Sequence, residues 1–132
     1  MKTRSVCAQV LSWIPPLCWM GLLYYLLTKP MDTEKLAWLP EHADKVVHFG
    51  FFLIMSWLFI YPFRVSLAMS WRKCAWCSFI LATAFGVWTE WIQSGLPHRQ
   101  TDLMDVMANI LGAGTVFLLR SRRLDPTLKI DI

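Results

Sequence analysis

The sequence predicts an all-α integral membrane protein, a single domain over residues 1–132 that forms a bundle of four transmembrane helices with both termini cytoplasmic. Two observations support this fold class. Apolar residues make up 56% of the chain and the mean hydropathy is +0.43, whereas a soluble domain is roughly 45–50% apolar. The charged residues are also separated by long uncharged stretches, as expected for segments that cross a bilayer core of about 20 helical residues.

Four uncharged stretches set the predicted helices. They hold 24 residues between Arg4 and Lys29, 18 between Lys45 and Arg64, 16 between Lys73 and Glu90, and 14 from Val106 to Leu119. We therefore expect helices at about 6–27, 45–63, 73–93 and 102–119, followed by a basic tail at 120–132. The last two helices reach a spanning length only if they include acidic residues, which brings carboxyl groups to the membrane.

The first helix resembles a signal peptide in one respect, because Lys2 and Arg4 precede it. Its apolar stretch is long, however, and no small-residue cleavage site precedes Lys29, so we expect a retained helix. Pro15 and Pro16 lie within it and predict a kink.

The distribution of basic residues predicts the orientation. With a cytoplasmic N-terminus, nine of the 13 Lys and Arg residues fall on the inner side and four on the outer side, which agrees with the positive-inside rule. This pattern indicates a multi-pass membrane protein. It also accounts for the net charge of +4, so we expect no nucleic-acid partner.

Polar residues gather at the outer ends of the last three helices. Helical spacing places Asp44 and His48 on one face of the second helix. Similar spacing aligns further polar residues on the third and fourth helices, and glycine and alanine residues beside them would allow close packing. We therefore predict one outward-facing polar pocket. Its expected ligand-binding residues are Asp44, His48, Glu90, Gln93, Arg99, Asp102, Asp105 and Asn109.

Each of these residues also has a structural interpretation. Asp44 and Asp102 could cap the helices that they precede, and His48 and Asn109 could join helices through hydrogen bonds. Glu90 is harder to explain in this way, because a carboxyl group within a membrane helix is costly and usually paired, protonated or functional. The location of the whole set at one end of the helices favours function.

Two blocks of the sequence resemble a known family. Residues 44–49 read Asp-Lys-Val-Val-His-Phe and are similar to the D-K-x-x-H-F signature of the VanZ-like membrane proteins. A second signature is matched in order by Glu90, Gln93, Pro97, Arg99, Asp102, Asp105, Asn109 and Gly112. The resemblance covers about residues 44–115, with one departure, His98, where the family usually has glycine. The family takes its name from a bacterial protein that lowers susceptibility to the lipoglycopeptide teicoplanin. The resemblance therefore implies a multi-pass protein of the bacterial inner (cytoplasmic) membrane.

Three hypotheses for function follow, and the residues leave all of them open. In the first, the pocket binds a headgroup of a membrane lipid, a lipid-linked cell-wall precursor or the lipoglycopeptide, with Arg99 holding an anionic group and His48 supporting it. In the second, His48, Glu90 and Asp105 are catalytic residues of a membrane enzyme, as general acid and base or with a divalent metal as cofactor. In the third, the polar residues only stabilise a structural or partner-binding subunit, and homo-oligomerisation is compatible with each.

Overall fold

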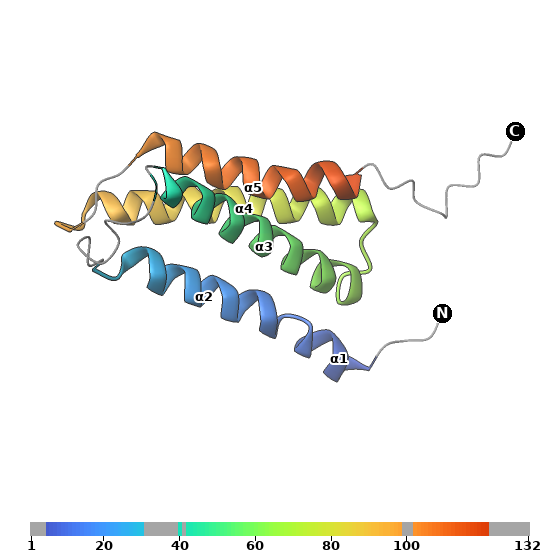
Figure 1. The fold of residues 1–132 in the computed structure, drawn as a ribbon. Helices are drawn as coiled ribbons and strands as arrows, with labels where there is room; N and C mark the ends of the chain where they lie inside the picture. Colours follow the sequence, from blue (N-terminus) through green and yellow to red (C-terminus); the bar gives the residue numbers. More distant parts are fainter. Residues whose placement is uncertain (1–4, 31–39, 41, 99–101, 122–132) are drawn as a thin grey trace, which may run out of the picture.

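The computed structural model describes residues 5–30, 40, 42–98 and 102–121, and Figure 1 shows that this part of the chain is helical and contains no strand. The helices are α1 (Val6–Leu11), α2 (Ile14–Thr28), α3 (Ala43–Val65), α4 (Trp71–Ser94) and α5 (Leu103–Ser121). The predicted all-α fold class is confirmed, and the predicted bounds of the spanning helices are met to within about two residues.

The helices are long and apolar enough for a multi-pass membrane protein. Val6–Thr28, Ala43–Val65 and Trp71–Ser94 each meet the length and hydropathy of a membrane span, and Leu103–Leu119 forms a shorter apolar helix. Helices suit this environment because they satisfy their backbone hydrogen bonds internally, where lipid offers no partners. Many large apolar side chains on their outer faces are exposed, for example Ile80, Leu111 and Leu118, as expected for residues that face lipid tails.

The first span is broken where its prolines predict a kink. Helix α1 ends at Leu11, and α2 begins at Ile14, so Pro15 and Pro16 occupy the first turn of α2. Proline is tolerated there because the first N–H groups of a helix have no intrahelical acceptor. The break lies just before the prolines and not at them. Within the break, the Trp13 indole donates to Ser66 Oγ (3.1 Å) and joins this span to the end of α3.

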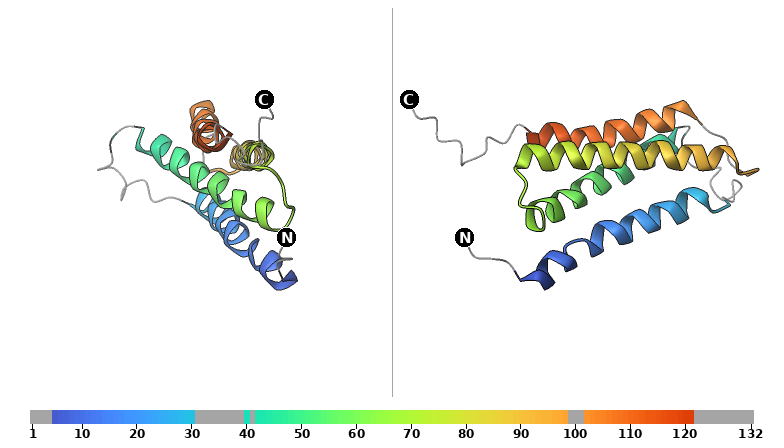
Figure 2. Two further views of the ribbon diagram at one scale, coloured as in Figure 1. Left: turned by 90° about the vertical axis from the view of Figure 1, so that its right-hand side faces the viewer. Right: turned by 180° about the vertical axis from the view of Figure 1, so that it is seen from behind.

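Helices α3, α4 and α5 pack closely together, and α2 lies against α3 and α4 (Figure 2). The core between them combines the large side chains of Phe52, Met55 and Phe59 on α3 with small residues such as Ala82 on α4 and Ala113 on α5. Small residues permit this close packing in a membrane, where helices associate mainly through van der Waals contact.

Gly112 lies where α5 approaches α3 closely. A Cβ atom at this position would collide with the backbone carbonyl of Phe49. The glycine is therefore required by space, not by an unusual backbone conformation.

The start of α1 and the end of α5 lie at one end of the bundle, together with the connection between α3 and α4 (Figure 1). The beginnings of α3 and α5 and the end of α4 lie at the opposite end. This arrangement agrees with termini on one side of the membrane. That this side is cytoplasmic stays a prediction from the basic residues.

Candidate functional site

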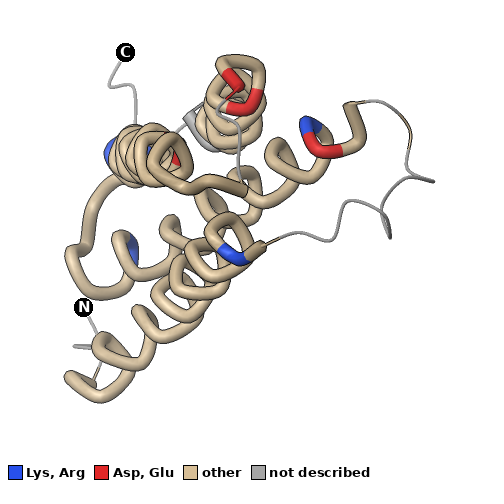
Figure 3. Tube along the Cα trace, turned by 90° about the vertical axis from the view of Figure 1, so that its left-hand side faces the viewer, with Lys and Arg blue, Asp and Glu red and all other residues tan. Residues whose placement is uncertain are grey.

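Polar and charged side chains gather at the end of the bundle where α3 and α5 begin and α4 ends. Viewed from this end, Figure 3 shows acidic residues on these three helices, with a basic residue beside the acid at the start of α3. We call the group formed by Lys45, His48, Glu90, Asp102, Asp105 and Asn109 the polar site.

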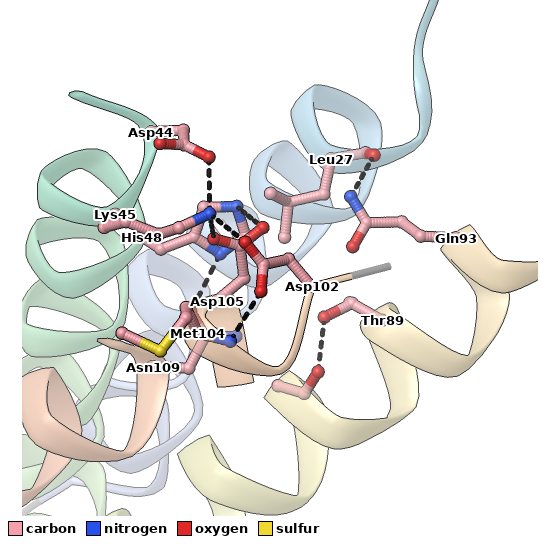
Figure 4. Close-up of polar contacts among 11 residues, drawn as sticks. Leu27, Asp44, Lys45, His48, Thr89, Gln93, Asp102, Met104, Asp105 and Asn109 are labelled. Atoms are coloured by element: carbon pink, nitrogen blue, oxygen red, sulfur yellow. Dashed lines mark hydrogen bonds and ion pairs between the residues drawn. The ribbon is translucent and has the colours of Figure 1, made fainter. Parts of the chain in front are cut away.

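Lys45 lies at the centre of the ion pairs of this site (Figure 4). Its Nζ is 2.6 Å from Asp102 Oδ2 and 2.6 Å from Asp105 Oδ1, and it donates a hydrogen bond of 2.7 Å to Asp44 Oδ2. One ammonium group thus joins the start of α3 to the start of α5 and meets three carboxylates. Such charge-assisted contacts are stronger than neutral hydrogen bonds.

His48 connects α3 to α5 one turn deeper. Its Nδ1 is 3.0 Å from Asn109 Oδ1, and its Nε2 is 3.9 Å from Asp105 Oδ2. The first distance is a hydrogen bond, whereas the second is too long to be one. His48 and Asn109 are both buried, so this contact is shielded from solvent.

Glu90 approaches the same point from α4. It is buried, and its Oε1 atom has no hydrogen-bond partner. One ligand atom each from Glu90, His48 and Asp105 lie within 4.8 Å of one another. The three residues predicted to be catalytic candidates are therefore brought together from three different helices.

Gln93 is buried at the same end but serves a different contact. Its Nε2 donates to the carbonyl oxygen of Leu27 (2.9 Å) and joins α4 to α2, while its Oε1 has no hydrogen-bond partner. His98, after α4, is 3.1 Å from the carbonyl oxygen of Thr28 through Nε2. Both side chains hold the end of α2, a role that the sequence did not predict for them.

The two predicted helix caps have different outcomes. Asp102 caps α5, because its Oδ1 accepts a hydrogen bond from the Met104 N–H (2.9 Å). The structural interpretation of Asp44 as the cap of the second helix is wrong, because His42 occupies the N-cap position and Asp44 lies within the first turn of α3. The helix begins two residues earlier than predicted, so the carboxylate of Asp44 turns to its neighbour Lys45 and stays half exposed.

Arg99 lies outside the described residues, so its predicted role in the pocket stays a prediction. Lys45, in contrast, was not among the predicted site residues. It was counted only as an outer charge at the start of the second helix and as the second residue of the D-K-x-x-H-F signature. Its position three residues before His48 places both side chains on one face of a helix, and this spacing is the signal that could have identified it.

A shallow depression adjoins the polar site between α4 and α5, with a volume of about 350 Å³. Its lining combines the acidic residues Glu90 and Asp102 with Trp91, Ser94, Leu103 and Val106. Trp91 and Leu103 are mostly exposed. The depression therefore joins polar groups to an apolar surface at the end of the bundle.

The stability of the protein should depend on the charge of Asp102 at low pH. The Lys45 ammonium and the Met104 N–H lower the pKa of Asp102 below its ordinary value of 3.8. A carboxyl group whose pKa is lower in the folded state contributes stability above the pKa of the unfolded state and loses it as the pH falls through the folded-state pKa.

We therefore expect Asp102→Asn, which preserves a good N-cap residue, to melt below the wild type at pH 7. The difference should shrink as the pH falls from about 4 toward 3. Thermal unfolding of both proteins in detergent across this range measures the effect. A difference that is constant with pH would contradict the assigned ion pair.

The fold and the polar site define a class: a multi-pass membrane protein with a buried cluster of acidic, imidazole and amide groups at one end of its bundle. A family model described as VanZ/LLP1 matches residues 12–122. The chain thus belongs to the VanZ-like family, as the two sequence blocks predicted.

The chain is also similar to a protein of the fission yeast Schizosaccharomyces pombe (strain 972), described as Uncharacterized protein C11E3.10. The two are 34% identical over 77 residues, which cover 58% of this chain and 45% of the yeast protein. The chain therefore spans less than half the length of this relative. No solved structure matches the chain.

Proposed function

We propose that this protein binds the polar headgroup of a membrane lipid, or of a lipid-linked precursor of the cell envelope, at the polar site. One observation carries the proposal: several buried polar atoms at this end of the bundle have no hydrogen-bond partner, among them Glu90 Oε1, Gln93 Oε1 and Asn109 Nδ2. Buried polar atoms are nearly always paired, and each unpaired one costs about 1–3 kcal/mol. A headgroup rich in hydroxyl, amine or phosphate groups would supply the missing partners.

The adjoining depression supports an amphiphilic ligand. Glu90 and Asp102 offer polar contacts on one part of its lining, while Trp91, Leu103 and Val106 offer apolar contacts on another. A lipid could place its headgroup against the acids and leave its chains beside the apolar residues. A fully water-soluble ligand would gain nothing from those apolar contacts.

The roles of individual residues extend this proposal. The aspartates would accept hydrogen bonds from hydroxyl or amine groups of the ligand. Arg99 would bind a phosphate or carboxylate, because a guanidinium group pairs with these in bidentate fashion, and His48 would support it. A link to teicoplanin susceptibility, and the bacterial inner membrane as the location, belong to the same proposal.

Photocrosslinking tests headgroup binding directly. A photoreactive amino acid at Ser94, which lines the depression, should capture one lipid headgroup class at least about threefold above its share in the membrane. Tyr25 is the matched control, because it is 61% exposed near the same end of the bundle but on α2. The enrichment should be absent there and should disappear at Ser94 in the background of Asp105→Asn.

Identical lipid profiles at Ser94 and Tyr25 would refute the proposal. They would favour the structural interpretation, in which the polar site only holds the helices together. In that case, Asp105→Asn should lower the yield of folded protein without any change in the captured lipids.

A second candidate function is acid–base catalysis on a lipid-linked substrate. It is favoured by the convergence of His48, Glu90 and Asp105, whose ligand atoms lie within 4.8 Å of one another, since an imidazole beside carboxyl groups is a common acid–base arrangement. The test is whether the wild-type protein chemically converts the lipid class that is captured at Ser94. Conversion that is lost in Glu90→Gln, while crosslinking of the lipid persists, would distinguish an enzyme from a binding protein.

A further inference from the structure

Three buried side chains direct donor atoms toward one small volume inside the bundle. His48 comes from α3, Glu90 from α4 and Asp105 from α5, and each residue is more than nine-tenths buried. One donor atom of each lies within 4.8 Å of the other two. An imidazole nitrogen and two carboxylate groups are a donor set that many metal sites in proteins use.

The hydrogen bond of His48 determines which of its nitrogens is free. Asn109 Oδ1, in the orientation that the structure gives the amide, accepts a hydrogen bond from His48 Nδ1 at 3.0 Å. Nδ1 therefore carries the proton, and the neutral ring has its lone pair on Nε2. Metal-binding histidines are commonly oriented in this way, with the second nitrogen donating to an amide or carboxylate oxygen.

The free nitrogen faces a carboxylate across a gap. His48 Nε2 is 3.9 Å from Asp105 Oδ2, too far for a hydrogen bond. A lone pair opposite a carboxylate oxygen is repulsive unless a positive charge lies between them. Lys45 does not supply this charge, because its contact with Asp105 is to the other oxygen, Oδ1 (2.6 Å).

Glu90 adds an independent observation. Its Oε1 is buried and has no hydrogen-bond partner, although Glu90 and Asp105 lie close together. Buried carboxylates usually have a cation or a shared proton nearby. Within residues 42–98 and 102–121, the acids at this end are Asp44, Glu90, Asp102 and Asp105, and Lys45 already contacts three of them.

We infer that His48, Glu90 and Asp105 together hold one divalent transition-metal cation of the zinc or manganese type. Metal–donor bonds of about 2.0–2.2 Å place neighbouring and opposite donors roughly 3–4.4 Å apart. Donors now within 4.8 Å need only small side-chain rotations to reach these distances. The imidazole favours zinc over magnesium or calcium, which prefer oxygen donors, and the two carboxylates are also compatible with manganese.

Three protein donors leave at least one coordination position for another ligand. Glu90 also lines the depression between α4 and α5, so a phosphate oxygen of a bound headgroup could reach that position. This role for the metal rests on the proposed function, whereas the metal site itself does not.

Metal titration of the full-length protein tests the inference. The protein, purified in detergent and treated with a chelator, should bind about one Zn²⁺ or Mn²⁺ per chain in calorimetry, and its melting temperature should rise with added metal. Glu90→Gln and Asp105→Asn should weaken binding by tenfold or more. His98→Gln, which removes an exposed imidazole outside the cluster, should bind as the wild type does.

A second measurement uses only the wild-type protein and so does not depend on whether a variant folds. In ¹⁵N-histidine NMR of the wild-type protein, added Zn²⁺ should shift one Nε2 resonance, and the other nitrogen of that ring should remain protonated. The inference would be overturned if the folded wild-type protein bound neither Zn²⁺ nor Mn²⁺ at about one ion per chain. A His48 ring that is protonated on both nitrogens and whose resonances do not change with added metal would also overturn it, because a proton on Nε2 would then lie between His48 and Asp105 Oδ2.

The two proposals fail separately. Lipid enrichment at Ser94 without metal binding would remove the metal site and leave headgroup binding intact. Metal binding that depends on Glu90 and Asp105, without lipid enrichment, would support the metal site and remove its proposed ligand.

Discussion

Replacing Lys45 with methionine is expected to lower the free energy of unfolding by about 2–3 kcal/mol at neutral pH. An exposed ion pair contributes at most about 1 kcal/mol, whereas loss of one partner from a buried pair costs about 3–5 kcal/mol. The side chains of Lys45 and Asp105 are 19% and 12% exposed, so the cost should fall between these limits. Methionine retains most of the aliphatic chain, and the effect should therefore come from the carboxylates that lose their cation. Unfolding in detergent, followed by circular dichroism, measures it.

Two comparisons separate this effect from a general effect of the substitution. Lys73→Met removes an exposed lysine at the opposite end of the bundle and should change stability by less than about 0.5 kcal/mol. In the background of Asp105→Asn, Lys45→Met should cost clearly less than in the wild type, because one of its charge partners is already neutral. Equal costs in both backgrounds would show that Lys45 does not stabilise the site through Asp105.

Substitution of Gly112 by alanine is expected to destabilise the protein by about 3 kcal/mol. Overpacking of a core costs about 1–3 kcal/mol when side chains can shift. Here the added methyl group meets the backbone carbonyl of Phe49, which cannot rotate away. Helices α3 and α5 must therefore separate, and the contacts between His48 and Asn109 should weaken with them. A lower melting temperature and a lower yield of folded protein are the expected readouts.

Gly50→Ala is the matched control, because it adds the same methyl group to α3 next to Phe49 and has no atom within 4 Å of the new Cβ. It should leave stability unchanged or raise it slightly, since alanine favours helices more than glycine does. If both variants lost the same stability, the close approach at Gly112 would not explain the effect.

The fold was largely predictable because membrane helices leave a strong signal in the sequence. The uncharged stretches predicted the spans, and Pro15 and Pro16 predicted a kink in the first span, which is broken just before them. The bounds shifted by a residue or two, because the uncharged stretches do not show where a helix begins. This shift rules out one structural interpretation: because α3 begins at Ala43, Asp44 lies inside the helix and cannot cap it.

The sequence predicted at which end of the helices the candidate site lies, but it did not predict which side chains contact one another there. Helical spacing correctly brought Asp105 and Asn109 to the same region as His48. It could not show that Gln93 turns its amide to Leu27, because that contact depends on where α2 lies, and helix packing leaves no such mark in a single sequence. Lys45 was missed for a related reason. A lysine at the end of an apolar stretch is usually a boundary residue whose side chain extends to the membrane surface. Lys45 has Asp102 and Asp105 as partners only because the start of α5 packs beside the start of α3.

The contact at Gly112 also bears on how the molecule could move. A methyl group at Gly112 would meet the Phe49 carbonyl, so the backbones of α3 and α5 lie close together at this point. Lys45 and His48 belong to α3, Asp105 and Asn109 belong to α5, and Glu90 belongs to α4. A tilt of α4 relative to the other two helices would move the Glu90 carboxylate toward or away from His48 and Asp105, and we expect a change in the geometry of the polar site to begin with such a movement.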